Sequence, residues 1–201
     1  TDGYDPNAFY WYEGFDNYDG STLPNGFSQP GMGISFTKTE ISGNPALKYV
    51  NEYIPEKSGT SNFSIKGTEP LDFSKGALLL SYDVTPQSNL TWLGDGAKSN
   101  ILIPTLRIGS TEISQLSIIE HGGIKAAYKT APTAWGRSAY LTGWENNTLV
   151  ADTTVKFQLL LEKEGNQITA TQYINEKPVY YTLSDEAKLA SVTVDITEEE
   201  L

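Results

Sequence analysis

Apolar and polar residues alternate over many short segments of this chain, which is the pattern of β-strands with one buried face. The alternation begins in an aromatic run at residues 9–16 and recurs at short intervals up to residue 196. The segment 76–85 is a continuous apolar run instead, which favours a central strand. The other segments that predict strands are residues 34–38, 46–53, 61–66, 100–108, 111–120, 124–129, 153–162, 167–175, 179–183 and 189–196.

Turn residues separate these segments at positions that suit antiparallel hairpins. Gly109-Ser110, Gly122-Gly123 and Gly165-Asn166 each join two predicted strands, and glycine and asparagine accept the positive φ of tight hairpin turns. Residues 184–187 predict one helical turn with Ser184 as its N-cap. The regular strand spacing predicts an all-β fold, a two-sheet antiparallel β-sandwich. We expect a single domain over 1–201, with a loose lead-in at 1–8 and a polar tail at 197–201.

Three segments are similar to parts of one known family. They are Tyr12-Glu13-Gly14-Phe15-Asp16 with Leu23-Pro24-Asn25-Gly26-Phe27, the strand 76–84, and the hairpin 155–175 with the Asn175-Glu176-Lys177-Pro178 turn that follows it. They resemble the opening, the central strand and a late hairpin of concanavalin-like (laminin-G-like) jelly-roll modules. The resemblance implies a carbohydrate-binding module, tethered to other domains of an extracellular or cell-surface bacterial protein that degrades polysaccharide.

The chain is acidic, with 25 Asp and Glu against 14 Lys and Arg and a formal net charge of −11. A charge of this sign repels phosphate backbones and anionic lipid surfaces, so neither nucleic acid nor a membrane is the expected partner. Cysteine is absent, which excludes disulfides and thiolate chemistry. No apolar run reaches the length of a membrane-spanning helix.

The sequence offers few residues for catalysis. Glycoside hydrolysis needs a pair of carboxylates, and no predicted strand has acids at the two-residue spacing that would place them on one face. One histidine without any cysteine cannot complete a tetrahedral zinc site. A sandwich-type polysaccharide lyase would use His121, Tyr128 and Arg137, unless His121 is simply a histidine in a surface turn. We predict that the chain is not an enzyme, with a lyase or hydrolase on the same fold as the alternative.

Three acids are candidate ligands of calcium, the one cofactor that we expect. Calcium takes about six to eight oxygen ligands, many of them from carboxylates. Glu13 and Asp16 lie on or directly after the first predicted strand and Asp195 lies on the last, and a jelly roll brings those strands together. The resemblance also implies a structural calcium at this place. Alternatively, these acids face water at a strand edge.

Aromatic residues supply the candidate ligand site. Sugar rings present apolar C–H faces that pack on tryptophan and tyrosine. Trp92, Trp135 and Trp144 lie in polar, glycine-containing segments that predict loops, where burial between two sheets is hardest. The residues expected to hydrogen-bond the sugar are Arg137, Tyr140 and Glu145. The predicted function is non-catalytic binding of polysaccharide or oligosaccharide. Alternatively, these tryptophans cap the ends of the sandwich, as in an adhesion module without a sugar site.

Overall fold

The computed structural model describes residues 13–28, 34–51, 65–67, 69–87, 105–119, 123–131, 134–140 and 151–201. The predicted lead-in at 1–8 lies outside these ranges. The chain divides into two compact units, Thr1–Pro70 and Leu71–Leu201, and the single domain expected over 1–201 stays a prediction. Each unit is therefore described by itself.

The first unit contains one antiparallel hairpin. Strand β1 (Ile34–Ile41) pairs with β2 (Asn44–Asn51) along their whole length, which confirms the strands predicted at 34–38 and 46–53. Ser42 and Gly43 form the turn, and both have positive φ, as a two-residue type I′ hairpin turn requires. Phe36 and Tyr49 are register partners with ring centroids 6.1 Å apart.

A loop before β1 is held by the carboxylate of Asp19. Asp19 Oδ1 accepts hydrogen bonds from the backbone of Ser21 (2.7 Å), the Ser21 hydroxyl (2.9 Å) and the backbone of Thr22 (2.9 Å). These bonds favour the charged form, and the backbone bonds from Thr22 and Ser21 are the main reason that the pKa of Asp19 is lowered from 3.8 to about 2.

We predict that this loop is sensitive to acid. Because the folded-state pKa of Asp19 is depressed, its stabilising effect is present above the ordinary pKa and disappears as the pH falls through about 2. A carbon-detected NMR titration of the Asp19 carboxyl should therefore give a midpoint near pH 2, and Ser21→Ala should raise it. A midpoint at the ordinary value in the unaltered protein would contradict the hydrogen bonding described above.

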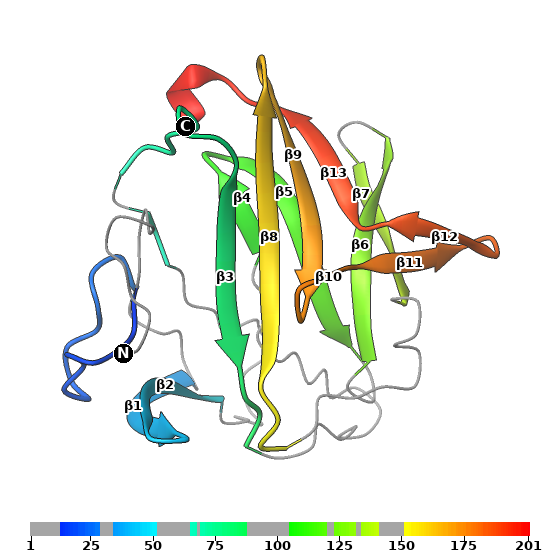
Figure 1. Ribbon diagram of the computed structural model, residues 1–201. Coiled ribbons are helices and arrows are strands. Elements are labelled where there is room, and N and C mark those ends of the chain that lie inside the picture. The colour runs from blue at the N-terminus through cyan, green and yellow to red at the C-terminus, as the bar shows by residue number, and fades with distance from the viewer. Residues whose placement is uncertain are drawn as a thin grey trace, which may run out of the picture. The chain divides into compact units, whose positions relative to one another are not determined.

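The larger sheet of the second unit has five antiparallel strands. They are β3 (Leu78–Val84), β8 (Val155–Glu164), β9 (Gln167–Ile174), β10 (Lys177–Pro178) and β13 (Ser191–Asp195). The order is β10-β9-β8-β3, and β13 also pairs with β9 (Figure 1). The predicted β8–β9 hairpin is confirmed, with Gly165 at φ +58° in its turn. The strand predicted at 76–85 is confirmed as β3, which stands last in the order of described strands and has Leu79 56% exposed.

A second sheet has four antiparallel strands in the order β4-β5-β6-β7. They are β4 (Thr105–Ile108), β5 (Thr111–Ile119), β6 (Gly123–Ala131) and β7 (Ala134–Tyr140). The first three confirm predicted strands. Strand β7 was predicted to be a loop, and this is the correction that matters most for the candidate site.

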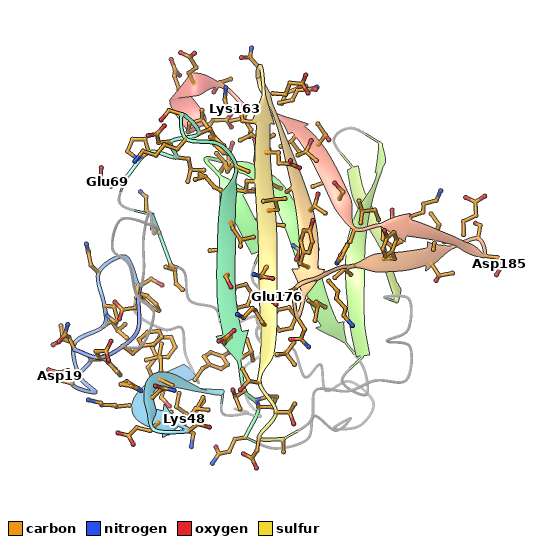
Figure 2. The ribbon with its side chains drawn as sticks, in the orientation of Figure 1. Asp19, Lys48, Glu69, Lys163, Glu176 and Asp185 are labelled. Carbon is orange, nitrogen blue, oxygen red and sulfur yellow. The ribbon has the colours of Figure 1, made fainter. Side chains whose placement is uncertain are left out.

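A hairpin of β11 (Tyr180–Leu183) and β12 (Glu186–Leu189) extends away from the five-stranded sheet, with Asp185 at its tip (Figures 1 and 2). The helical turn predicted at residues 184–187 is wrong. Ser184 and Asp185 both have positive φ, at 52° and 64°, so they form a two-residue hairpin turn without glycine. The hairpin leaves the sheet between β10 and β13, and β11 contacts β7 of the four-stranded sheet.

Two hydrophobic clusters fill the second unit. The larger one combines Ile108 and Ile113 of β4 and β5 with side chains of β8, β9 and β13, so the β4–β5 hairpin packs against the five-stranded sheet. The smaller one contains Val155, Phe157, Ile174, Val179 and Ala190. The predicted all-β, antiparallel class is confirmed. Among the described residues, no helix has the length and apolar character needed to cross a membrane.

The chain ends in a short 3-10 helix, Glu198–Glu200, that is tied to the second unit. Glu200 accepts hydrogen bonds from the Thr111 hydroxyl at 3.0 Å and from the backbone of Thr197 at 3.0 Å. Leu71 donates its backbone N–H to Leu201 O at 2.8 Å, and both leucine side chains pack on the larger cluster. In the polar tail predicted at 197–201, residues Thr197–Glu199 are exposed, whereas Glu200 and Leu201 contact the rest of the second unit.

Candidate functional site

Three of the predicted sugar-binding residues lie on β7, in a strand and not in a loop. Trp135, Arg137 and Tyr140 all fall within Ala134–Tyr140, which pairs with β6. The register shifts at Gly136. Tyr128 is the register partner of Arg137, but the next residue, Lys129, is the partner of Trp135, so Gly136 is the extra residue of a β-bulge. Glycine is common at such bulges, which is why a segment with the composition of a loop forms a strand here.

The register of β6 and β7 places aromatic and basic residues opposite one another. Its three pairs with large residues are Lys125 with Tyr140, Tyr128 with Arg137, and Lys129 with Trp135, so each joins one aromatic to one cation. The remaining pairs join alanine to alanine or serine. Directly opposed residues of an antiparallel ladder have Cα atoms about 4.5 to 5.5 Å apart. Two of these pairs, Lys125 with Tyr140 and Lys129 with Trp135, fall on one face of the two strands, because Lys125 and Lys129 are four residues apart. The pair of Tyr128 with Arg137 falls on the other face.

Trp92, Trp144 and Glu145 lie outside the described residues, as does His121 of the lyase hypothesis. Tyr128 and Arg137 of that hypothesis are register partners. The start of β6, which adjoins the His121 segment, is five residues or about 17 Å along the strand from Tyr128.

An exposed pair of residues on the β11–β12 hairpin was missed by the sequence analysis. Tyr180 and Leu189 are register partners and remain 45% and 41% exposed. Tyr181, the next residue, packs on the smaller hydrophobic cluster. Successive side chains of a strand point to opposite faces, so the Tyr180-Tyr181 pair in the sequence was the available signal that one ring faces outward. Because β11 contacts β7, Tyr180 lies on a strand next to the aromatic and basic pairs.

The three predicted calcium ligands are divided between the two units. Glu13 Oε1 accepts a hydrogen bond from the Phe15 backbone at 2.6 Å, and Asp16 is exposed. Asp195 lies on β13, where its Oδ1 accepts a hydrogen bond from Gln167 Nε2 at 3.0 Å. Within the described ranges, no three His, Asp or Glu residues gather in a way that could hold a metal ion. Calcium binding by these acids stays a prediction.

The shifted pKa values of the described groups have structural causes. Hydrogen bonds from Ser74 lower the pKa of Asp72, and those from Thr197 and Thr111 lower the pKa of Glu200. Burial raises the pKa of the Tyr82 phenol well above its ordinary value and, less strongly, that of Tyr49. These groups lie in turns, at the chain end or in packed strands, away from the β6–β7 pairs in sequence.

A fold of this class serves many functions, so the activity has to be argued from particular residues. The structure places the aromatic and basic pairs of β6 and β7 on adjacent strands, with Tyr180 on the neighbouring strand. Comparison of the chain with protein-family models, curated proteins and solved structures gives no match.

Proposed function

We propose that this chain is a non-catalytic carbohydrate-binding module that holds polysaccharide against strands β6 and β7. The observation that supports this most directly is the register of β6 and β7, in which two pairs on one face, Lys125 with Tyr140 and Lys129 with Trp135, each join an aromatic to a basic residue. Aromatic rings pack on the apolar faces of sugars, and lysine and arginine donate hydrogen bonds to their oxygens. No proton transfer or nucleophile is required for such binding.

We also propose how the two sheets of the second unit are arranged. The second unit is a two-sheet β-sandwich of the jelly-roll, concanavalin-like type, found in an extracellular or cell-surface bacterial protein. The larger hydrophobic cluster supports this arrangement, because it joins side chains of β4 and β5 to those of β8, β9 and β13. Aligned sheets that share one core in this way are typical of sandwiches.

A polysaccharide lyase is the second candidate function, and the pairing of Tyr128 with Arg137 favours it. In such an enzyme, tyrosine acts as the base and arginine balances the charge of the uronate carboxylate. We expect no unsaturated uronate product from acidic polysaccharides. Product that disappears in Tyr128→Phe would establish the lyase instead.

Tyr180→Ala tests the proposed binding surface at a residue that is exposed. We expect polysaccharide binding to weaken by about 1 kcal/mol or more, because exposed aromatic rings dominate binding surfaces of this kind. Unfolding should change little, since the ring is 45% exposed. The measurement is isothermal titration with a polysaccharide that the unaltered protein binds.

Leu79→Ala is the matched control. Leu79 is also a large exposed residue, but it lies on β3, at the opposite end of the strand order from β10. Its truncation should leave binding unchanged. Equal losses in both variants, or none in Tyr180→Ala, would argue against a binding surface next to β7.

Chelation tests the calcium hypothesis. If Glu13, Asp16 and Asp195 share an ion, EDTA should lower the melting temperature, because a ligand at about 100 times its Kd stabilises the folded state by about 2.7 kcal/mol. Asp195→Asn should abolish this response to EDTA. A melting curve that is the same with EDTA and with added calcium would show that these acids are merely solvated.

A further inference from the structure

Basic residues are distributed unevenly between the two sheets of the second unit. The four-stranded sheet carries four basic residues and one acidic residue, namely Arg107, Lys125, Lys129 and Arg137 against Glu112. Its acid, Glu112, is the register partner of Arg107 on the β4–β5 hairpin. The strands of the five-stranded sheet carry three basic and four acidic residues, namely Lys156, Lys163 and Lys177 against Asp83, Glu162, Glu164 and Asp195.

The excess of positive charge is confined to β6 and β7. No aspartate or glutamate occurs between Glu120 and Glu145, in a chain whose formal net charge is −11. Strands β6 and β7 both lie inside this stretch, and their three cations have aromatic register partners in place of acidic ones. Acidic partners directly across a strand pair would stabilise the sheet, and no acid stands at the β6–β7 register positions opposite these cations.

We infer that the ligand of the β6–β7 surface is an acidic polysaccharide, one that carries carboxylate or sulfate groups along its chain. This inference rests on the proposed function and specifies the class of polysaccharide. A neutral polysaccharide would stack on Trp135 and Tyr140 but would gain little from Lys125 and Lys129. An anionic chain uses both halves of these two pairs, because its rings pack on the aromatic residue while its charged groups meet the neighbouring cation.

Charge also separates this ligand from nucleic acid, which offers bases for stacking and phosphates for cations. Duplex DNA carries one negative charge about every 1.7 Å, and the rest of this acidic chain would repel so dense a polyanion. Charges on an acidic polysaccharide are spaced farther apart along the chain. The combination of a local basic strand pair and a net charge of −11 therefore favours the polysaccharide.

The test compares acidic and neutral polysaccharides with two triple variants of the full chain. The probes are polygalacturonate, alginate and chondroitin sulfate, against xylan, starch and a mixed-linkage β-glucan, with poly(dT) as a second polyanion. One variant is Lys125→Gln/Lys129→Gln/Arg137→Gln. The matched variant, Lys38→Gln/Lys48→Gln/Lys66→Gln, has the same net charge but changes residues of the first unit only.

We expect binding to at least one acidic probe, weakened by added salt, and binding to the neutral probes that is at least about tenfold weaker. The β6–β7 triple variant should lose at least about tenfold in affinity for the acidic probe, since the charge-assisted contacts of Lys125 and Lys129 are removed. The matched variant should bind like the unaltered protein. Circular dichroism shows whether each variant is folded, and the single substitutions replace any triple variant that is not.

Each contrary result has its own meaning. Binding to a neutral probe that is as tight as to any acidic one, and that is lost in Trp135→Ala, would overturn the acidic ligand while the proposed function stands. Binding to none of these polysaccharides would overturn both. Equal losses in the two triple variants, or tighter binding to poly(dT) than to any polysaccharide, would also overturn the inference.

Discussion

Truncation of Phe157 to alanine should lower the free energy of unfolding by about 3 to 5 kcal/mol. Phe157 is 4% exposed and belongs to the smaller hydrophobic cluster, with Val155, Ile174, Val179 and Ala190. Its ring stacks on that of Tyr82, its register partner on β3, with centroids 5.5 Å apart and an interplanar angle of 15°. Removal of the ring leaves a cavity that rigid strands on both sides cannot close, and it exposes one face of Tyr82.

Urea unfolding followed by circular dichroism measures this loss. Leu79→Ala on the same strand as Tyr82 provides the control, because Leu79 is 56% exposed and its truncation should cost less than about 1 kcal/mol. A cost below about 1 kcal/mol for Phe157→Ala would show that β3 and β8 do not pack as described.

Truncation of Trp135 to alanine should abolish most polysaccharide binding and leave the fold intact. Loss of a stacked aromatic typically costs about 2 kcal/mol or more of binding free energy, which is about thirtyfold in affinity. Trp135 lies on β7, which ends the order of described strands in its sheet, at the register position of Lys129. A tryptophan of the core would behave oppositely and cost about 3 to 5 kcal/mol of unfolding free energy.

Trp135→Phe separates the two roles further. It keeps an aromatic face, so binding should recover in part while the unfolding free energy stays unchanged. The measurements are isothermal titration and urea unfolding on the same preparations. Unfolding of Trp135→Ala, with normal binding by the fraction that stays folded, would show that Trp135 belongs to the core.

The strands that the sequence predicted well are those in which local pattern and pairing agree. The β8–β9 hairpin combines period-two alternation with Gly165-Asn166, and it forms with the predicted turn. The two strands of the β1–β2 hairpin were predicted from their alternation alone. In both cases the residues that specify the strand also specify its partner, so no distant contact is needed to decide the structure.

The failed predictions concern segments whose structure is decided by a partner strand. Strand β7 contains Gly136, which indicated a loop, but pairing with β6 accommodates the glycine in a bulge. Ser184 was predicted to cap a helical turn, because serine is a good N-cap. Here it adopts φ 52° in a hairpin turn, since β11 and β12 pair on either side.

The candidate site could be predicted only in part. The sequence indicated Trp135, Arg137 and Tyr140 by residue type, but not that β6 places Lys129, Tyr128 and Lys125 opposite them, because a register with bulges cannot be derived from composition. Tyr180 was missed because its contact strand, β7, was not recognised. The proposed calcium ligands depend on the relative positions of distant segments, which a sequence pattern does not fix.

The central claim is that polysaccharide binds on β6 and β7, and NMR tests it most directly. Backbone amide resonances of the labelled protein would be followed during titration with a polysaccharide selected by the binding panel. We predict that the largest shifts occur in Gly123–Ala131 and Ala134–Tyr140, with smaller ones at Tyr180–Leu183, and that Trp135→Ala abolishes them. Shifts confined to Leu78–Val84 and Val155–Glu164, or to Ile34–Asn51 in the first unit, would contradict the claim.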